Sequence, residues 1–227
     1  MNDWFLLPLA PGPAAWNMAF DETLLNHLAD WSAPVLRFYS WEEPAATFGY
    51  FQHYRDIAEW TALRPLIRRP TGGGLVRHDA DWTYSIAVPP EHPWYSFRAE
   101  ESYRHMHEWI ARAFDALGVR SNLSPCCDKE IPGQCFIGAE KYDLLVNGKK
   151  IAGAAQRRNK LGLLIQGSIQ QQPGGLLRDA WEREMLTSVD PRWEVSWKEL
   201  KISDTVRNNV TQLAATKYSQ RAYNEKR

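Results

Sequence analysis

The sequence predicts an α+β fold whose sheet is mostly antiparallel, and three observations support this prediction. Segments with helical periodicity and short strand-like segments interleave irregularly along the chain, as expected for an α+β protein. One pair of strand-like segments is joined by a two-residue turn, which suits antiparallel strands. Of the 227 residues, 44% are hydrophobic, which is enough for a packed core and argues against a disordered chain.

The first third of the chain predicts one helix followed by short strands. The helix begins near residue 13 or 14 and ends before Pro34. Large apolar side chains recur along it at helical spacing: Trp16, Phe20, Leu24, Leu28 and Trp31. Four apolar runs that follow predict strands, at 35–39, 45–48, 66–68 and 82–88.

A second helix and a hairpin are predicted in the middle of the chain. The helix runs from about residue 97 to residue 117. The hairpin joins 142–146 to 150–156 through Asn147-Gly148, because a type I′ turn needs positive φ at both central residues. The remaining predicted elements are a strand and two helices, at 163–169, at 176–187 and after Lys201.

The charge balance and the cysteine content exclude several classes of protein. Lys and Arg total 27, as do Asp and Glu, so the neutral chain has no global attraction to nucleic acid or to an anionic membrane. The most apolar stretch is interrupted by prolines and falls short of the about 20 residues that span a bilayer. Asp3 stands where a signal peptide would be basic. With three cysteines and no CxxC motif, we expect free thiols and a cytoplasmic protein.

The first candidate for a functional segment is a glycine run flanked by basic residues. Gly72, Gly73 and Gly74 follow a predicted strand, and three glycines allow a backbone to approach a ligand closely or to adopt positive φ. Arg68, Arg69, Arg77 and His78 favour an acyl, carboxylate or phosphate site. The segment matches neither a Walker loop nor GxGxxG. The alternative is a simple glycine-rich turn.

The second candidate is the outgoing strand of the predicted hairpin. Strand alternation puts Lys150, Ala152 and Ala154 on one face, and Gly153 and Ala155 on the other. Small residues leave room for a ligand across the strand, and a neighbouring lysine can hold a carboxylate or lower the pKa of a thiol. The alternative is a solvated hairpin lysine, which suits Lys149 better than Lys150.

The third candidate is Cys135, in a loop-like segment before the hairpin. A lone cysteine is more often a small buried hydrophobic residue than a nucleophile. Cys126 and Cys127 do not form an ordinary zinc spacing with it, so we expect no metal site. Asp21 and Glu22 on the first helix are interpreted as surface or capping charges.

Several segments together resemble the biotin/lipoate protein ligase superfamily, on its lipoate side. They are WNMAFDETLL, RRPTGGGLVRHD, DWTYSIAVPP, GKKIAGAAQRR and LLIQGSI, in this order between about residues 14 and 190. The resemblance implies a class II synthetase/biotin protein ligase-like fold with a mostly antiparallel sheet flanked by helices. It also implies a single catalytic domain over residues 1–227, with a core at about 14–190 and a C-terminal helical extension at about 191–227.

Within this superfamily the chain resembles the cysteine-dependent octanoyltransferases, because Cys135 stands 15 residues before Lys150. The resemblance implies octanoyl (or lipoyl) transfer from acyl carrier protein to a lysine of a lipoyl domain, through a thioester on Cys135 and with no cofactor. The acceptor would be a domain such as the glycine cleavage H protein or the E2 of a 2-oxoacid dehydrogenase. Lys150 would lower the pKa of the thiol and stabilise developing charge.

The resemblance also implies which side chains hold the acyl group. One wall of the acyl tunnel would come from the glycine run and the strand after it: Thr71, Gly72, Gly73, Gly74, Val76, Trp82 and Tyr84. Arg69 is expected among the substrate-binding residues as well. The other wall would come from Ala152, Gly153 and Ala155. His78 is expected to contact the carbonyl group or the carrier.

Two departures from the family pattern keep alternatives open. Some octanoyltransferases have a small residue with a side chain at the position of Gly74, and Gln166 stands where the family often has histidine. One alternative is a lipoate–protein ligase that uses ATP and magnesium, with Lys150 on the phosphate. Others are an amidotransferase acting between lipoyl domains and a non-catalytic binding subunit.

Overall fold

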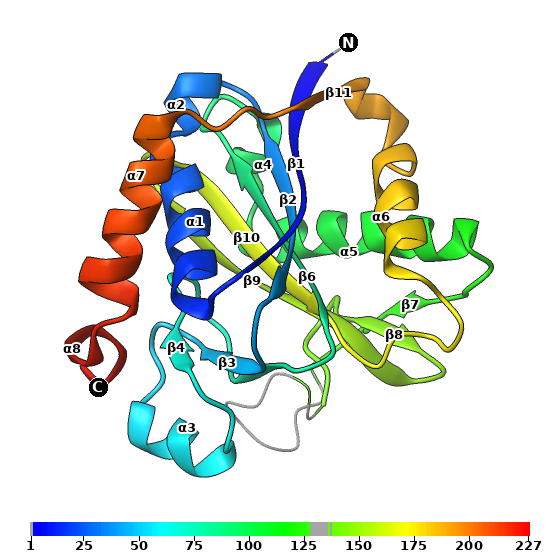
Figure 1. Cartoon of the computed structure of the whole chain (residues 1–227). Helices are drawn as coiled ribbons and strands as arrows, with labels where there is room; N and C mark the ends of the chain where they lie inside the picture. Colours follow the sequence, from blue (N-terminus) through cyan, green and yellow to red (C-terminus); the bar gives the residue numbers. More distant parts are fainter. Residues whose placement is uncertain (1, 128–135, 137) are drawn as a thin grey trace.

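A computed structural model describes residues 2–127, 136 and 138–227 of the chain (Figure 1). The strands are β1 (Asn2–Gly12), β2 (Val35–Trp41), β3 (Ala45–Phe48), β4 (Leu66–Arg68), β5 (Val76–His78), β6 (Trp82–Val88), β7 (Asn122–Leu123), β8 (Leu144–Val146), β9 (Lys149–Asn159), β10 (Gly162–Ile169) and β11 (Val195–Glu199). The α-helices are α1 (Ala14–Asn26), α2 (Leu28–Trp31), α3 (Tyr54–Trp60), α4 (Pro93–Ser96), α5 (Ala99–Ala116), α6 (Arg178–Thr187), α7 (Asp204–Leu213) and α8 (Arg221–Asn224). A 3₁₀ turn (Pro191–Trp193) and a π-helical turn (Ala214–Tyr218) complete the elements of the described residues.

The main sheet is mostly antiparallel, which confirms the predicted fold class. Among the described residues it contains eight strands in the order β11-β1-β2-β6-β10-β9-β8-β7. Only the pairs that β1 makes with β11 and β2 are parallel. A second sheet, of order β4-β3-β5, lies beside it. Asn147 and Gly148 have φ of 50° and 74° in the predicted hairpin turn, as a type I′ turn requires.

Strand β1 is an element that the sequence analysis did not predict. The segment contains Pro8 and Pro11, and a proline cannot donate to a strand ladder. The structure accommodates Pro8 at a register shift between Leu7 and Ala10, where β1 pairs with β2. The partner of β1 on its other side, β11, lies far along the chain and carries no strong local signal.

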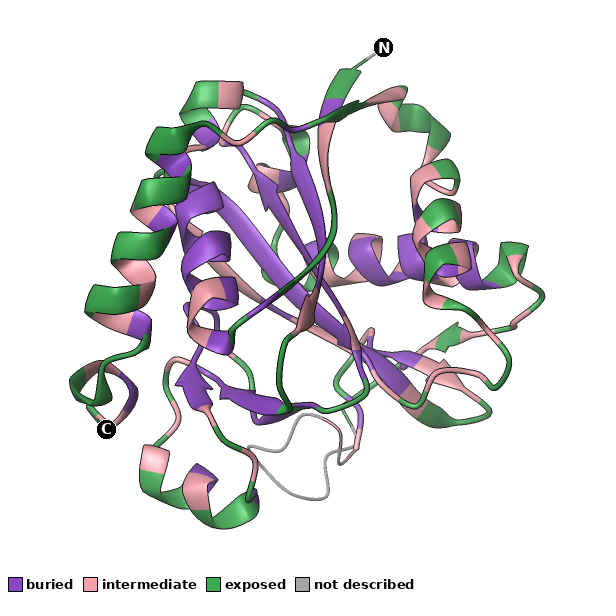
Figure 2. Ribbon diagram, viewed as in Figure 1, coloured by how far each residue is buried: buried purple, intermediate pink, exposed green. Residues whose placement is uncertain are grey.

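Helices cover both faces of the main sheet, so its central strands β2, β6 and β10 are largely buried (Figures 1 and 2). Helix α1 packs on one face, and α7 packs against α1. Helices α5 and α6 pack together on the opposite face. All of β10 is buried, which fits its near-continuous run of apolar and small residues. No helix of the described residues is long and apolar enough to cross a membrane.

A cluster of tryptophans fills the core on the α5 side of the sheet. The ring of Trp4 lies 6.0 Å from those of Trp94 and Trp109, and 5.7 Å from that of Trp197, each in an edge-to-face arrangement. His92 joins the cluster, with its ring 5.3 Å from Trp4. Burial among these apolar rings lowers the pKa of His92 to about 4.

We expect His92 to make the protein less stable in mild acid. Its pKa is lower in the folded chain than the unfolded value of about 6.5, so the folded state loses stability as the pH falls from 6.5 towards 4. Chemical denaturation at pH 7 and pH 5 should show that His92→Phe reduces this loss by about 1 kcal/mol, after allowance for solvent screening. An equal loss of unfolding free energy in the wild-type protein and in His92→Phe would contradict the assignment of this pH dependence to His92.

Candidate functional site

One cavity of about 330 Å³ lies between the two sheets and the ends of α1 and α5. Its mouth carries exposed charged residues, including Glu100, Glu140 and Lys141. Its inner wall is buried and is lined by Met18, Tyr39, Thr47, Arg69, Val76, His78, Thr83, Gln166 and Ser168. Phe136, Lys150 and Asp143 lie on the same cavity. A volume of this size suits a small ligand or an acyl chain.

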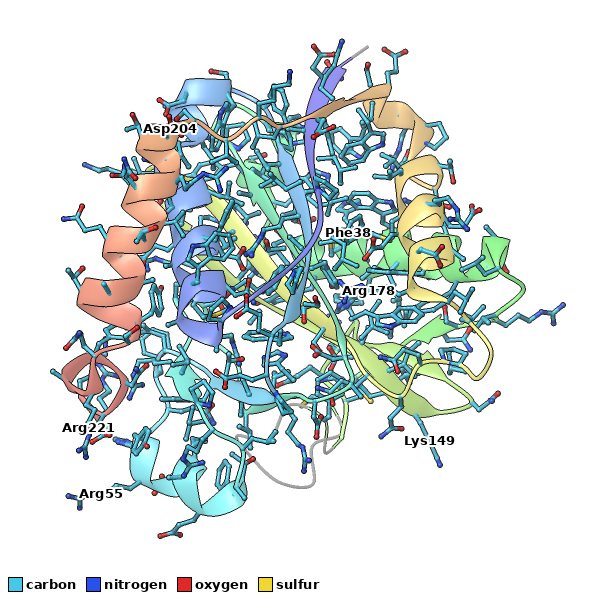
Figure 3. The ribbon with its side chains drawn as sticks, viewed as in Figure 1. Phe38, Arg55, Lys149, Arg178, Asp204 and Arg221 are labelled. Atoms are coloured by element: carbon cyan, nitrogen blue, oxygen red, sulfur yellow. The ribbon has the colours of Figure 1, made fainter. Side chains whose placement is uncertain are left out.

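Lys150 and Asp143 form a buried ion pair on the cavity wall. Lys150 Nζ lies 2.6 Å from Asp143 Oδ2, and both side chains are only 6% exposed. The backbone N–H of Glu140 also donates to Asp143 Oδ2, at 2.7 Å. Lys150 Nζ lies 4.8 Å from the centre of the Phe136 ring. The pair therefore holds one ammonium group at a fixed place beside the cavity. Lys149, by contrast, extends into solvent (Figure 3), as its turn position predicts.

The predicted alternation along β9 is wrong at Lys150. It placed Lys150 and Gly153 on opposite faces, but both line the same cavity. A Cβ added to Gly153 would lie 2.8 Å from Lys150 Cε. The reason is a β-bulge: Leu144 pairs with Ala152 and Leu145 with Lys150, so one extra residue of β9 interrupts the alternation.

Cys135, the predicted nucleophile, lies outside the described residues. The next residue in the chain, Phe136, is described and lines the cavity beside Lys150. Cys126 and Cys127 are exposed. Among the described residues, no group of three or more His, Cys, Asp or Glu side chains is arranged to hold a metal ion.

Arg69 organises the glycine run from within. Its Nη2 donates to the carbonyl oxygens of Gly72 (2.9 Å) and Gly74 (2.8 Å), and its Nη1 donates to Thr47 Oγ1 (2.9 Å). Gly73 has a φ of 82°. A Cβ on Gly49 would lie 1.8 Å from the carbonyl oxygen of Gly73, so this close backbone approach requires glycine. Gly73 is therefore held in a fixed position on the cavity wall.

His78 belongs to a buried hydrogen-bond network centred on Asp81. Its Nδ1 lies 2.8 Å from Asp81 Oδ2, and its Nε2 lies 2.8 Å from Thr47 Oγ1. The Trp41 ring stacks on the imidazole at 3.9 Å. Burial raises the pKa of Asp81, but His78 and the hydroxyls of Thr83 and Ser168 outweigh it and lower that pKa overall.

Asp21 and Glu22 are buried, which corrects their interpretation as surface or capping charges. Asp21 is 0% exposed and accepts hydrogen bonds from four side chains: Arg37, Tyr39, Ser85 and Gln166. Glu22 pairs with Arg157 and Lys217 and accepts a hydrogen bond from Tyr218. A signal was present for Asp21, since it lies three residues after Met18 and four before Leu25, on an apolar helix face.

The structure brings together only part of the predicted site. The predicted residues on the cavity wall are Arg69, Gly73, Val76, His78, Lys150, Gly153 and Ala155. Thr71 lies one layer behind and donates to Gln166 Oε1 at 2.7 Å. Gly72 and Gly74 bond to Arg69 through their carbonyl groups.

Trp82, Tyr84 and Ala152 pack in the hydrophobic core on the α5 side of the sheet. Tyr84 lies beneath Gly167, where its ring occupies the space of a Cβ. Asp143 and Phe136 also line the wall, and no local pattern predicts them, because distant segments meet at the cavity. Gln166, which the sequence marks only as a departure from the family pattern, lies on the wall as well.

Comparison with known proteins gives consistent matches. The model of the lipoyl protein ligase A/B catalytic domain matches residues 13–179. The chain is 36% identical over 182 residues to octanoyltransferase LipM of Lysinibacillus sphaericus (strain C3-41), a match that covers 74% of this chain and 66% of that protein. It is 34% identical over 222 residues to octanoyltransferase LipM of Exiguobacterium sp., covering 92% of this chain and 80% of the relative. In several of these relatives, the matched region is less than two thirds of the relative's own length.

Two solved structures share the fold over the whole chain. Protein Ta0514 of T. acidophilum, solved with bound lipoic acid, has a TM-score of 0.81 at 22% identity, and the match covers 100% of both chains. Lipoate-protein ligase A bound with ATP has a TM-score of 0.80 at 21% identity, with 99% of both chains covered.

Proposed function

Because this chain belongs to the lipoyl protein ligase A/B catalytic-domain family, we propose that it is an octanoyltransferase of lipoate biosynthesis. The donor is octanoyl acyl carrier protein, and the acceptor is a lysine of a lipoyl domain. The relatives at 34–36% identity carry the name octanoyltransferase, and one structural neighbour was studied with an E2 lipoyl domain.

The observation that carries the proposal is the ammonium group of Lys150 beside Phe136. Asp143 holds Lys150 at the cavity wall, and Phe136 follows Cys135 directly in the sequence. A positive charge near a thiol favours the thiolate, which is the nucleophilic form. The apolar groups of Met18, Val76 and the small residues of β9 offer space for an acyl chain.

The proposed reaction has two acyl transfers. The Cys135 thiolate attacks the carbonyl carbon of the octanoyl thioester, and the carrier leaves as a thiolate that takes up a proton. The amine of the acceptor lysine then attacks the new thioester, forms the amide and loses a proton, and the Cys135 thiolate is released. Lys150 stabilises the developing oxyanion in both steps. Because the donor thioester is already activated, no nucleotide is consumed.

A direct test measures acyl transfer to a lipoyl domain in chelator-treated buffer without nucleotide. We expect acylation from octanoyl acyl carrier protein, read as a mass increase of the lipoyl domain. We expect no modification from free lipoate with ATP and magnesium. Strong ATP-dependent modification from free lipoate that survives Cys135→Ala would instead support a lipoate–protein ligase.

Gly153→Ala is expected to slow the transfer with little loss of stability. The new Cβ would lie 2.9 Å from Lys150 Nζ and 3.2 Å from Asp143 Oδ1. The flexible lysine can move away, so the fold survives, but its ammonium group shifts from the reacting carbonyl. We expect a loss of about 10-fold or more in kcat. Gly174→Ala is the matched control, since its Cβ meets nothing within 4 Å. Unchanged kcat in Gly153→Ala would contradict the role of Lys150.

A further inference from the structure

The inner wall of the cavity carries several buried polar side chains, which is unexpected for a site that holds a hydrocarbon chain. Four buried side chains with hydrogen-bond donors form what we call the polar wall: Tyr39, Thr83, Gln166 and Ser168. Each is at most 5% exposed. A hydrogen-bond donor that points into the cavity would lose its hydrogen bond to water when an acyl chain enters, at a substantial cost in binding free energy.

The donors of the polar wall turn away from the cavity towards two buried carboxylates. Asp21 accepts from the Tyr39 hydroxyl at 3.0 Å and from Gln166 Nε2 at 2.7 Å. The second hydrogen of that amide faces Met18 Sδ at 3.5 Å. Asp81 accepts from the hydroxyls of Thr83 (2.8 Å) and Ser168 (2.7 Å) through the same oxygen.

His78 and Arg69, which lie next to the polar wall, also direct their ring and guanidinium nitrogens towards other groups of the protein. His78 Nδ1 faces Asp81, and its Nε2 faces Thr47 Oγ1. Arg69 directs N–H groups to Thr47 and to the carbonyl oxygens of Gly72 and Gly74. The pKa of Asp81 is lowered despite its burial, so Asp81 stays an ionised acceptor at neutral pH.

From this geometry we infer that Asp21 and Asp81 make the polar wall a specificity device that accepts hydrogen bonds but donates none to the bound chain. The inference rests on the proposed function and names its substrate class. The cavity takes saturated acyl chains and discriminates against chains of the same length that carry a carbonyl group. A hydrocarbon needs no donor, whereas an in-chain carbonyl loses its hydrogen bonds to water and finds none on the polar wall.

A hydroxyl on the chain is a different case, because it can donate. Hydroxyl and amide oxygens of the polar wall retain acceptor lone pairs. An apolar cavity without this arrangement would lower the affinity for a ketone and for an alcohol alike. A wall that only accepts penalises the ketone more.

The test measures binding of ligands that cannot be transferred, so that it does not depend on turnover. Isothermal titration calorimetry compares octanamide with its 5-oxo, 6-oxo and 7-oxo derivatives and with the matching hydroxy derivatives. We expect each ketone to bind roughly 5- to 100-fold more weakly than octanamide, and more weakly than its alcohol. A ketone that binds as tightly as octanamide, or an absence of octanamide binding, would overturn the inference.

A variant tests the role of the carboxylate. Asp81→Asn introduces N–H donors into the network, so the ratio of ketone to octanamide affinity should rise by at least about 3-fold. Asp79→Asn is the matched control, because Asp79 is exposed and pairs only with Arg77 among the contacts described. An unchanged ratio in a folded Asp81→Asn protein counts against the inference. The proposed function fails separately, if octanamide binds as expected but octanoyl acyl carrier protein gives no transfer.

Discussion

Replacing Cys135 with alanine is expected to abolish octanoyl transfer, with a loss of at least about 10³-fold in kcat. The nucleophile carries the acyl group between donor and acceptor, so no other side chain can substitute for it in the proposed reaction. Incubation of the wild-type protein with octanoyl acyl carrier protein, followed by peptide mapping, should find one octanoyl group on the Cys135 peptide. The adduct should disappear when a lipoyl domain is added.

The controls use the other two cysteines of the chain. Cys126→Ala and Cys127→Ala remove exposed thiols that lie outside the cavity wall, and both variants should retain the adduct and the wild-type rate. An octanoyl group that persists on Cys135→Ala, or transfer that proceeds without any adduct, is incompatible with the proposed intermediate.

Lys150→Ala is expected to lower kcat by about 10²- to 10³-fold, because it removes the charge that we propose to stabilise the oxyanion. It should also raise the pKa of the Cys135 thiol towards the free value of ~8.5. The pH profile of alkylation at Cys135 then shifts to higher pH. An identical midpoint in both proteins would assign Lys150 another role, such as phosphate binding in a ligase.

Stability must be separated from catalysis, because Lys150→Ala leaves Asp143 buried without its counter-charge. Breaking such a pair costs about 3–5 kcal/mol. The double variant Lys150→Met, Asp143→Asn removes both charges, so it should recover much of the unfolding free energy without recovering kcat. Lys149→Ala, on the exposed side of the same turn, should change stability by less than about 0.5 kcal/mol. Recovery of kcat in the double variant would show that Lys150 acts only on stability.

Local patterns predicted most of the secondary structure. The strands at 45–48, 66–68 and 82–88 have the predicted bounds, and 176–187 is largely helical as α6. The apolar stripe before Pro34 forms α1 and α2, separated at His27. Each depends on nearest neighbours along the chain: apolar periodicity, β-branched residues or turn chemistry. Strand β1 was not predicted, and its pairing with β2 shows the register shift between Leu7 and Ala10 that accommodates Pro8.

Local patterns in the sequence were enough to predict the fold class and to single out some of the residues that line the cavity: Gly73, Lys150 and the small residues of β9. The way these groups face one another depends on contacts between distant segments. A bulge in β9 turned Lys150 towards Gly153, and Asp143 became its partner through a contact between strands. Asp21 became a buried acceptor for residues of three strands. These pairings form because burying a charge or a donor without a partner costs free energy. The partners come from distant segments, so local sequence patterns do not reveal them.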